Sequence, residues 1–593
     1  TSYSENEATP LLHGTENLPL IFNDMVKKQG NRPALLSRED ENVKTIPWSE
    51  FGRHVREFAT GLASLGIGTG ERIAILSENR PEWLISDLAI QTINAISVPV
   101  YATLTPKEIE FIIADSGASA IILSDEHQYK KVASIKGNTP FLRHIIGFDA
   151  GEGILSMEKL MAIGREEGNG GLVDAKICGI KGDDIFSIIY TSGTTGRPKG
   201  VMLSHANLLS NILASLKSII VRPDDLYLSF LPLSHIFERM VHHLIIHQGA
   251  SIAYSKGFAY VGADIALFKP TLIAGVPFFF ERIRDKIMDN VGNSSYLKRK
   301  LFSWAYSAGK RRFAAGEDSF SSRLAHNLVL NRLKNRLNPG LRFFISGGAP
   351  LPKDVGEFFW TLGIPILEGY GLTETSPVVA VNSLDTVKLG TVGRPIPGVE
   401  VRIAEGGEIQ VKGPNVMKGY WNMPEATKEA IKDGWFSTGD IGSVDKDGFL
   451  TITDRKKDII ITALGKNVSP QRLEALLRQN RYIKDAVIFG DRRPHLAALI
   501  IPEMERLKEY AKEKAIYYKN DEGLIKNRMV YRFYEKIIHE ALKELARFEQ
   551  IRRFALIPEL SQDRGELTPT LKVKRRVVEE KYKTIIDSLY ELP

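Results

Sequence analysis

The sequence predicts an α/β protein in which parallel sheet is covered by helices on both faces. Short apolar runs alternate with segments of helical spacing between residues 15 and 123, and the alternation resumes after residue 200. Such alternation is typical of parallel strands joined by helical crossovers. The chain of 593 residues is too long for one core and predicts about three or four domain-sized units. Its hydrophobic content of 43% and charged content of 25% indicate a folded chain and no disordered class.

The expected elements follow one another in a regular order. Strands are expected where apolar residues form short runs, and helices where apolar residues recur every three or four positions. Residues 285–340 are basic and helical in pattern, with little motif content. The other elements are a helix at 15–30, strands at 32–36 and 45–48, helices at 48–65, 81–93 and 105–115, and strands at 72–76, 95–100, 118–123, 185–189, 201–203, 227–231 and 342–346.

Residues 66–71 superficially suggest a dinucleotide-binding loop, because glycine stands at positions 66, 68 and 70. The fingerprint requires its third glycine at the position that Glu71 occupies here. We therefore interpret the run as a helix stop and a turn that leads into the strand at 72–76.

The charge balance is basic and uneven. The net charge is +7, and Lys and Arg cluster between Arg455 and the C-terminus, for example in residues 572–576. Three interpretations compete: a solvated basic face, nucleic-acid binding, or capture of anionic small molecules such as nucleotides and coenzyme A. A solvated face explains most of these charges, and no nucleic-acid-binding motif supports the second interpretation.

The cysteine content and the N-terminal residues bear on the compartment. Cys178 is the only cysteine, so one chain forms no disulfide, and a reducing compartment fits. Residues 1–14 are polar and lack the basic and apolar regions of a signal peptide. No apolar run approaches the ~18 residues that a membrane span requires. We expect a cytoplasmic location and leave peripheral contact with the inner face of the membrane open.

The run Tyr-Thr-Ser-Gly-Thr-Thr-Gly-Arg-Pro-Lys-Gly at residues 190–200 can wrap an anion. Its glycines admit close approach of backbone N–H groups, while hydroxyls and two cations surround the same space. A P-loop needs Gly and Lys five and six positions after its first glycine, then Ser or Thr. Counting from Gly193 gives Pro198 and Lys199, followed by Gly200. Residues 201–203 are expected to form a strand before a helix capped by Ser204, so the anion cannot rest on a helix N-terminus.

Four histidines lie at 235, 242, 243 and 247, and His243 and His247 have helical i, i+4 spacing. A zinc site would need a third ligand and an acid between the pair, which residues 244–246 do not supply. We expect an ordinary helix with partly buried imidazoles.

The run at 190–200 resembles, almost letter for letter, the phosphate-binding loop of the adenylate-forming enzymes, which include acyl-CoA synthetases, luciferases and peptide-synthetase adenylation domains. The resemblance covers about residues 15 to 580 and rests on five ordered motifs. It implies that Lys199 and Thr373 act on phosphate, that Glu374 and Thr191 hold Mg²⁺, that His235 lies near the reacting carboxylate, and that Lys572 is the adenylation lysine, with Lys574 as backup. It also implies the nucleotide- and coenzyme-binding residues Thr191, Ser192, Gly193, Thr194, Thr195, Gly196, Gly348, Ala349, Glu368, Gly369, Tyr370, Gly371, Asp440, Arg455 and Gly465.

Further details of that resemblance concern individual positions. Tyr370 is expected to stack on adenine, Asp440 to accept the ribose hydroxyls, and Gly465 to face pantetheine. Relatives commonly carry Arg at the position of Phe278, and this departure bears on the acyl pocket. Residues 240–254 and 272–280 could line an acyl tunnel, but core packing explains them equally well.

The resemblance implies an α/β protein with a large N-terminal domain at 1–454, which contains parallel-sheet α/β layers and a β subdomain. A smaller mobile α+β domain is expected at 455–593, with a helical insertion near 503–550. The implied activity is a medium- or long-chain fatty acid–CoA ligase: ATP and the acid give acyl-AMP and pyrophosphate, and coenzyme A then gives acyl-CoA and AMP, with Mg²⁺ as cofactor. The alternatives are a fatty acyl-AMP ligase that loads a carrier protein, and a non-enzymatic basic polyanion-binding protein. No nucleic-acid partner is expected, and a homodimer stays open.

Overall fold

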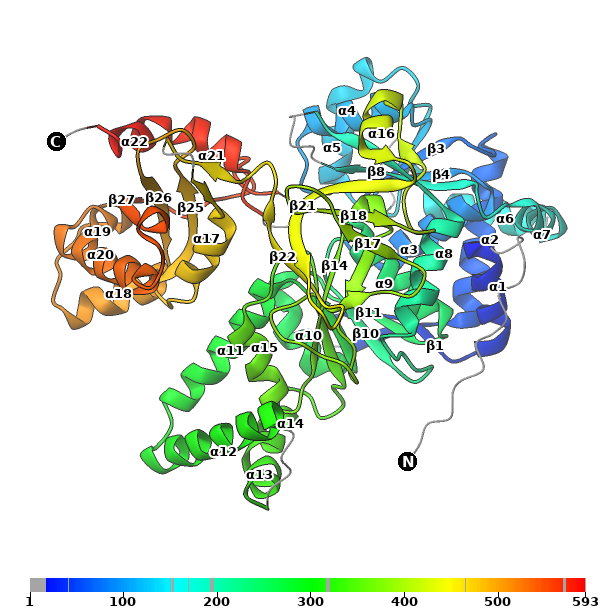
Figure 1. The fold of residues 1–593 in the computed structure, drawn as a ribbon. Coiled ribbons are helices and arrows are strands. Elements are labelled where there is room, and N and C mark those ends of the chain that lie inside the picture. The colour runs from blue at the N-terminus through cyan, green and yellow to red at the C-terminus, as the bar shows by residue number, and fades with distance from the viewer. Residues whose placement is uncertain are drawn as a thin grey trace. The chain divides into compact units, whose positions relative to one another are not determined.

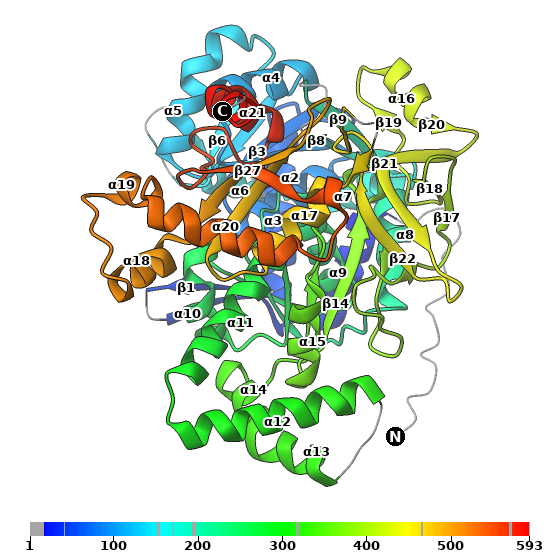
Figure 2. The same ribbon diagram turned by 60° about the vertical axis from the view of Figure 1, so that its left-hand side comes forward.

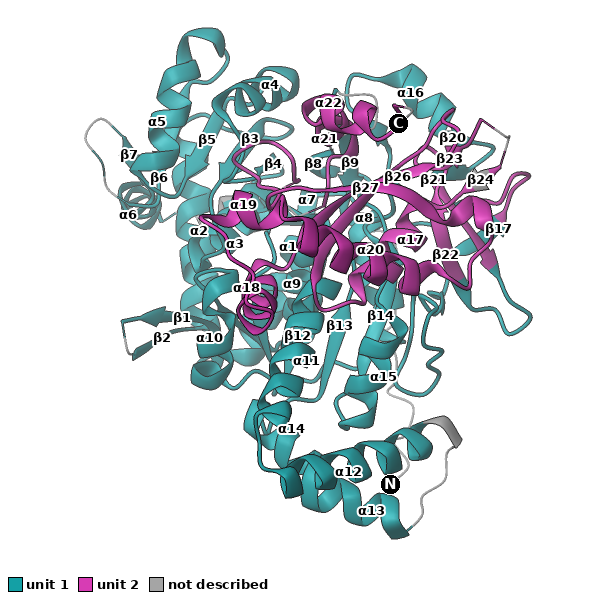
Figure 3. Ribbon diagram, turned by 90° about the vertical axis from the view of Figure 1, so that its left-hand side faces the viewer, with its two compact units in different colours: residues 1–402, 410–438, 444–450 teal, residues 403–409, 439–443, 451–593 magenta. Residues whose placement is uncertain are grey.

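The computed structural model describes residues 17–40, 42–149, 151, 154–168, 170–191, 197–315, 320–463, 466–568 and 572–591. The chain forms two compact units (Figure 3). Unit 1 comprises Thr1–Arg402, Gln410–Thr438 and Val444–Leu450. Unit 2 comprises Ile403–Ile409, Gly439–Ser443 and Thr451–Pro593. Unit 2 also takes in the short segments 403–409 and 439–443, so the units do not divide at a single point of the chain. The domain boundary expected at residue 454 therefore remains a prediction.

The first sheet of unit 1 has nine strands in the order β16-β15-β14-β13-β12-β10-β11-β1-β2. Its central strands, from β14 to β1, are parallel, and the strands at both edges are antiparallel. The strands are β1 (Pro33–Glu39), β2 (Asn42–Pro47), β10 (Leu226–Ser229), β11 (Ser251–Tyr254), β12 (Leu272–Gly275), β13 (Phe343–Ser346), β14 (Ile366–Gly371), β15 (Val378–Val381) and β16 (Arg394–Pro395).

The second sheet has eight strands in the order β19-β9-β8-β4-β3-β5-β6-β7. It is parallel from β8 to β7, while β9 pairs antiparallel with both β8 and β19. The strands are β3 (Arg72–Leu76), β4 (Ile96–Val100), β5 (Ala120–Leu123), β6 (His144–Gly147), β7 (Leu155–Ser156), β8 (Ile185–Thr191), β9 (Lys199–Ser204) and β19 (Gly419–Tyr420).

Helices α3 and α8 lie between these two sheets, because each contacts strands of both (Figure 1). All but one residue of α3 is buried, as expected for a helix covered on two sides. The helices outside the segment 277–337 are α1 (Leu18–Gln29), α2 (Trp48–Ser64), α3 (Pro81–Thr92), α4 (Pro106–Ser116), α5 (Glu126–Ile135), α6 (Met157–Glu167), α7 (Gly170–Gly179), α8 (His205–Leu216), α9 (Ile236–His247), α10 (Val261–Phe268), α15 (Lys353–Thr361) and α16 (Pro424–Ala430), with short turns η1 (Lys136–Asn138), η2 (Phe258–Tyr260) and η4 (Thr373–Thr375).

Residues 277–337 form a helical lobe of unit 1. Its elements are α11 (Pro277–Gly292), α12 (Tyr296–Ala315), α13 (Phe320–Ala325), the π-helical turn η3 (His326–Leu330) and α14 (Asn331–Leu337). Figures 1 and 2 show that α12 and α13 lie at the end of unit 1 away from its sheets. The helical pattern expected at 285–340 is therefore confirmed.

Five further strands belong to a sheet of order β17-β18-β21-β20, with β22 paired to β21. The boundaries between the two units fall within these strands, at residues 402/403, 409/410, 438/439, 443/444 and 450/451. The strands are β17 (Glu400–Ile403), β18 (Glu408–Lys412), β20 (Ile431–Lys432), β21 (Trp435–Val444) and β22 (Leu450–Arg455).

The C-terminal part of unit 2 contains a three-stranded sheet with helices. Strand β25 pairs antiparallel with β26, and β26 pairs parallel with β27. A parallel pair requires a long crossover connection, which the helices between residues 503 and 550 supply, where the sequence predicted a helical insertion. The elements are β23 (Ile460–Ile461), β24 (Asn467–Val468), β25 (Ile483–Phe489), β26 (Leu496–Pro502), β27 (Ile551–Leu556), α17 (Pro470–Arg478), α18 (Met504–Glu513), α19 (Asp521–Ile525), α20 (Arg528–Leu542), η5 (Arg547–Glu549), α21 (Arg575–Lys581) and α22 (Lys583–Ser588).

The predicted α/β architecture is confirmed, with a large N-terminal part and a smaller C-terminal part. The strands expected at 72–76 and the helix expected at 81–93 match β3 and α3. The parallel sheet is divided into two sheets, and their antiparallel edges were not expected. Within the described residues, no helix combines the length and apolar character needed to cross a membrane.

Candidate active site

Strand β8 and strand β9 form a hairpin whose connection contains the glycine- and threonine-rich run. Thr191 at the end of β8 pairs with Lys199 at the start of β9. Residues Ser192, Gly193, Thr194, Thr195 and Gly196 lie outside the described residues. Strand β9 continues to Ser204, whose hydroxyl accepts the Asn207 N–H (3.2 Å) and caps α8. The predicted strand and cap are confirmed, so this is a hairpin loop and differs from a P-loop, whose helix begins at the phosphate.

The base of the hairpin loop is joined to η4 through Tyr420. The Tyr420 hydroxyl donates a hydrogen bond to Oε1 of Glu374 (3.0 Å), and Nζ of Lys199 lies 4.7 Å from the centre of the Tyr420 ring. Burial raises the pKa of Tyr420, and the charge of Glu374 raises it further, so the hydroxyl stays protonated and donates. Sequence reasoning missed Tyr420, because it lies in a two-residue strand without a motif.

The parallel strands β10, β12, β13 and β14 end at one edge of the first sheet, and several of the expected site residues lie at this edge. Gly348 and Ala349 come after β13, Glu368 to Gly371 form the end of β14, and His235 comes six residues after β10. Strands β12, β13 and β14 are adjacent and parallel, with Ser346 opposite Glu368. Carboxyl ends of parallel strands are where open α/β sheets bind ligands. The structure therefore gathers residues from three motifs at this edge.

The turn after β13 is closely packed. The Gly347 N–H donates to the Gly275 carbonyl (3.1 Å), and a Cβ on Gly347 would lie 3.1 Å from the Phe237 ring. Gly348 has φ +84°, in the left-handed region that favours glycine. Backbone conformation thus favours glycine at 348, and a side chain at 347 would press on the Phe237 ring.

Strand β14 carries the predicted adenine motif. Glu368 is 7% exposed, its Oε1 accepts the Leu351 N–H (2.9 Å), and burial raises the pKa of its carboxyl to about 8. A Cβ on Gly371 would lie 2.1 Å from the Pro377 carbonyl oxygen, so no larger residue fits. Tyr370 and Gly369 are half-buried, and the Thr373 side chain in η4 is buried.

His235 is the N-cap of α9. Its Nδ1 accepts the Phe237 N–H (3.1 Å), which satisfies one N–H group of the first turn. The adjacent segment is held by the second sheet, since the Ser234 hydroxyl donates to the Val100 carbonyl (3.0 Å) and the Leu233 N–H donates to Asn79 (2.9 Å). The structure thus shows a capping role for His235 at the same sheet edge.

Helix α9 is fixed by a buried polar network. Nε of Arg239 donates to Asp87 of α3 (2.8 Å), and both side chains are fully buried. The Tyr227 hydroxyl donates to Glu238 (2.7 Å), and burial raises the pKa of Glu238 to about 8. Burial lowers the pKa of His242 to about 3, so its imidazole is neutral. Within the described residues, no group of three or more His, Cys, Asp or Glu residues has the arrangement of a metal site.

The three aromatics at 278–280 differ in environment. Phe279 and Phe280 are buried in the core cluster of the first sheet and α15, which agrees with the core interpretation. Phe278 is partly exposed, stacks on Phe258 with ring centres 6.0 Å apart, and has the Arg282 guanidinium 4.9 Å from its ring centre.

In unit 2, the chain brings Asp440, Arg455 and Lys572 together. Nε of Arg455 donates to Oδ1 of Asp440 (3.0 Å). Lys572 is an exposed residue, yet the protein atoms around its ammonium desolvate the charge. This desolvation lowers the pKa of Lys572 to about 8; the charge of Arg455 lowers the pKa further, and Asp440 opposes both effects. The assignment of Lys572 as the adenylation lysine, with Lys574 as backup, stays a prediction. Gly465 lies outside the described residues.

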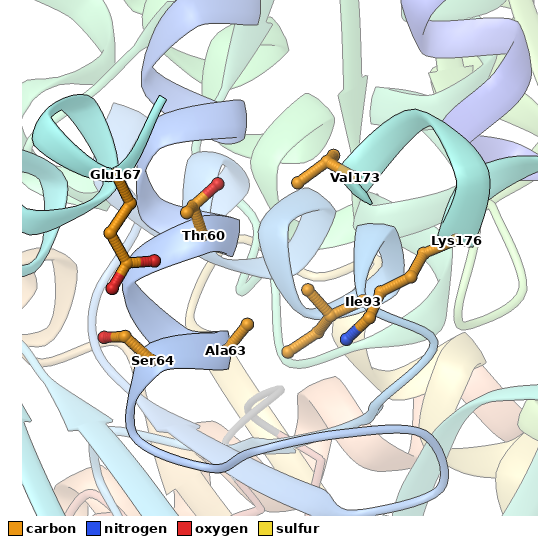
Figure 4. Close-up of a pocket in the computed structure, with 7 residues that line it drawn as sticks. All are labelled: Thr60, Ala63, Ser64, Ile93, Glu167, Val173 and Lys176. Atoms are coloured by element: carbon orange, nitrogen blue, oxygen red, sulfur yellow. The ribbon is translucent and has the colours of Figure 1, made fainter. Parts of the chain in front are cut away.

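Figure 4 shows a pocket of unit 1 that contains none of the expected site residues. The hydroxyls of Thr60 and Ser64 donate to carbonyls of their own helix, so they are already satisfied. A ligand site usually has polar groups that converge on the ligand, and we interpret this pocket as a packing gap. It is lined by Thr60, Ala63, Ser64, Ile93, Glu167, Val173 and Lys176.

Comparison with known proteins agrees with the motifs. The AMP-binding enzyme family matches residues 22–421, and the AMP-binding enzyme C-terminal domain matches residues 457–592. The chain belongs to the AMP-binding enzyme family, which confirms the resemblance to adenylate-forming enzymes.

Individual relatives match over nearly the whole chain. The long-chain-fatty-acid–CoA ligase FadD15 of Mycobacterium bovis is 36% identical over 556 residues, which cover 92% of each chain. The peroxisomal long chain acyl-CoA synthetase 7 of Arabidopsis thaliana is 32% identical over 593 residues, which cover 93% of this chain and 83% of that one. A solved structure of an anthranilate–CoA ligase in complex with anthranoyl-AMP has a TM-score of 0.73 at 21% identity and covers 98% of this chain and 100% of that chain. This structural likeness shows the fold alone.

Proposed function

We propose that the chain is a long-chain-fatty-acid–CoA ligase that forms AMP. The carboxylate of a fatty acid attacks the α-phosphorus of ATP, which gives acyl-AMP and releases pyrophosphate. The thiol of coenzyme A then attacks the acyl carbon and displaces AMP, so that a thioester forms. The observation that carries this proposal is the gathering of three motifs at the carboxyl edge of the first sheet, joined to the hairpin loop through Tyr420 and Glu374.

Adenylation brings two anions together, so the site must compensate negative charge before it can orient the reactants. Lys199 supplies a cation at the base of the hairpin loop, and its position over the Tyr420 ring restrains it. Thr373 supplies a hydroxyl for the α-phosphate. Tyr370 supplies a ring for adenine, and the backbone of Gly348 and Ala349 admits the flat base.

Mg²⁺ fits the oxygen groups that the chain offers. Glu374 is oriented by the Tyr420 hydroxyl, and Thr191 lies opposite Lys199 at the end of β8. Magnesium prefers hard oxygen ligands and usually retains waters and substrate phosphates, so one carboxylate and one hydroxyl are sufficient from the protein. When bound, the ion neutralises charge on the phosphates of ATP.

The residues of unit 2 receive separate roles. Asp440 accepts hydrogen bonds from ribose hydroxyls, and Arg455 holds the Asp440 carboxylate by its own hydrogen bond. The Lys572 ammonium stabilises the charge that develops as pyrophosphate leaves. Gly465 is assigned to the approach of pantetheine in the thioester step.

Pyrophosphate release, measured with fatty acids of increasing length and with or without coenzyme A, tests this function. A ligase releases pyrophosphate only when fatty acid is present and forms acyl-CoA when free coenzyme A is added. Adenylation without thioester formation from free coenzyme A would indicate the acyl-AMP ligase instead. Binding of polyanions without fatty-acid-dependent pyrophosphate release would indicate the non-enzymatic alternative.

A further inference from the structure

The helical lobe exposes an unusual share of the large apolar side chains of this protein. Among the described residues, eight of the 21 exposed large hydrophobic side chains lie between residues 288 and 328. Leu297 is 77% exposed and Phe320 is 81% exposed. Scattered exposed apolar residues are normal on a soluble protein, but a concentration of them marks an interaction site.

These side chains form stripes at helical spacing. On α12, Leu297, Leu301 and Trp304 lie four and three positions apart, which places them on one face of the helix. A second stripe, Phe320, Leu324 and Leu328, repeats every four residues along α13 and η3. We call these six residues the α12–α13 surface.

The α12–α13 surface is additional to the contacts that hold the lobe in place. Phe302, Ala305 and Ala308 of α12 are buried in the core cluster, together with Ala325 of α13 and Leu330 of η3. The buried face of the lobe is therefore part of the core cluster of the first sheet and α15. Internal packing accounts for the buried residues and leaves the exposed stripes unexplained.

The same segment is strongly basic. Residues 296–337 contain ten lysines and arginines and two acids, a net charge of +8, whereas the whole chain carries +7. Lys298, Arg299 and Lys300 are all exposed and stand between Leu297 and Leu301 on α12. Long basic side chains keep their charge in water while their stems lie along apolar surface. Exposed apolar and exposed basic side chains thus occur together on the N-terminal turns of α12.

We propose that the α12–α13 surface docks on an anionic lipid membrane. The leucines, Trp304 and Phe320 enter the boundary between headgroups and acyl chains, while the neighbouring lysines and arginines contact lipid phosphates. A nucleic acid would match the charge but would leave the apolar stripes in water, whereas a lipid surface matches both. Docking places unit 1 at the surface in which long-chain fatty acids dissolve.

Co-sedimentation of the full chain with lipid vesicles tests this proposal. Vesicles of phosphatidylcholine alone are compared with vesicles that also contain phosphatidylglycerol, without nucleotide or fatty acid. The outcome is therefore independent of the proposed ligase activity. We expect binding to the anionic vesicles that weakens as salt is added; equal binding to both kinds of vesicle would overturn the proposal.

The first variant removes the apolar stripe of α12 by Leu297→Ser, Leu301→Ser and Trp304→Ser together. All three side chains are exposed, so we expect the thermal unfolding midpoint to stay close to that of the parent. The vesicle partition coefficient should fall about tenfold or more, because apolar area no longer leaves water. Unchanged vesicle binding in this variant would overturn the proposal. It would indicate a surface that binds polyanions in general, to which duplex DNA should bind as well as the vesicles do.

The second variant removes three charges by Lys298→Gln, Arg299→Gln and Lys300→Gln together. Each basic residue near an anionic membrane raises the vesicle partition coefficient several-fold, so the loss of three should lower it roughly a hundredfold. Binding that survives this change unaltered would show that the lobe is not the docking surface.

A matched control comes from another exposed site with the same chemistry. In unit 2, Tyr517 is 85% exposed and is flanked by the exposed residues Lys514 and Lys519. The variant Lys514→Gln, Tyr517→Ser and Lys519→Gln loses an aromatic group and two charges but leaves the lobe intact. Its vesicle binding should equal that of the parent within twofold, and a loss as large as that of the lobe variants would overturn the assignment to the α12–α13 surface.

Discussion

The hydroxyl of Tyr420 is the group whose removal tests the site most directly. In Tyr420→Phe, the ring that lies 4.7 Å from Nζ of Lys199 is kept, while the hydrogen bond to Glu374 (3.0 Å) is lost. A hydrogen bond to a charged group contributes about 1.5–3 kcal/mol. If Glu374 holds Mg²⁺ in the transition state, kcat/KM for pyrophosphate release should fall about tenfold to a hundredfold.

The assay is fatty-acid-dependent pyrophosphate release measured over a series of Mg²⁺ concentrations. We expect the Tyr420→Phe variant to require more Mg²⁺ for half-maximal rate, because its Glu374 carboxylate is no longer oriented. Tyr190→Phe is the matched control: the Tyr190 hydroxyl, on strand β8 of the same sheet, donates to a different carboxylate, Asp115 (2.6 Å). The control should keep the Mg²⁺ dependence of the parent.

Two results would refute the reasoning. Equal kcat/KM and Mg²⁺ dependence in Tyr420→Phe and in the parent would show that the contact with Glu374 is structural only. An equal shift of the Mg²⁺ dependence in Tyr190→Phe would assign the effect to general loosening of the hairpin.

Four further predictions concern other parts of the chain. Lys572→Ala should raise the activation free energy of adenylation by several kcal/mol and leave thioester formation from supplied acyl-AMP largely intact. Lys574→Ala should adenylate at the parent's rate, and the reverse pattern would assign the role to Lys574. Because the pKa of Lys572 is about 8, the parent's adenylation rate should decline as pH rises through that value, measured as pyrophosphate release against pH. Gly371→Ala should lower the free energy of unfolding by about 1–3 kcal/mol in a denaturant titration, since its Cβ would lie 2.1 Å from a facing carbonyl oxygen. Gly68→Ala, with open space around it, should leave the free energy of unfolding almost unchanged, and equal effects of the two substitutions would contradict the steric argument. Burial raises the pKa of Glu238 to about 8, so between about pH 4.5 and 8 the folded state keeps a proton that the unfolded state releases, and the free energy of unfolding falls as pH rises. Glu238→Gln should remove up to ~4 kcal/mol of this fall, measured by urea titrations at pH 5 and pH 8. An equal fall in the parent and in the variant would contradict this prediction.

Much of the local structure of the candidate site could be predicted from adjacent residues. The apolar run before Tyr190 predicted β8, and Ser204 predicted the start of α8. The distinction from a P-loop therefore followed from spacing, because a strand stands where a phosphate-binding helix would begin. Similarly, the position of Glu71 excluded a dinucleotide loop, and the strand expected after it is β3.

Other features could not be predicted, because they depend on residues that are distant in sequence. Tyr420 meets Glu374 from 46 positions away, and nothing in its short strand indicates that contact. Arg239 and Asp87 are 152 positions apart, and a sequence gives no sign that an arginine in an ordinary helix will be fully buried.

By itself, the sequence determined the α/β class, the order of the motifs and the distinction of the loop from a P-loop, since these depend on spacing and on neighbouring side chains. Only the tertiary structure decided which motifs meet at one sheet edge, which tyrosine orients Glu374, and which apolar residues of the helical lobe remain exposed. The physical reason is that burial and contact depend on the packing of whole elements, whereas periodicity and turn chemistry act within a few residues of the chain.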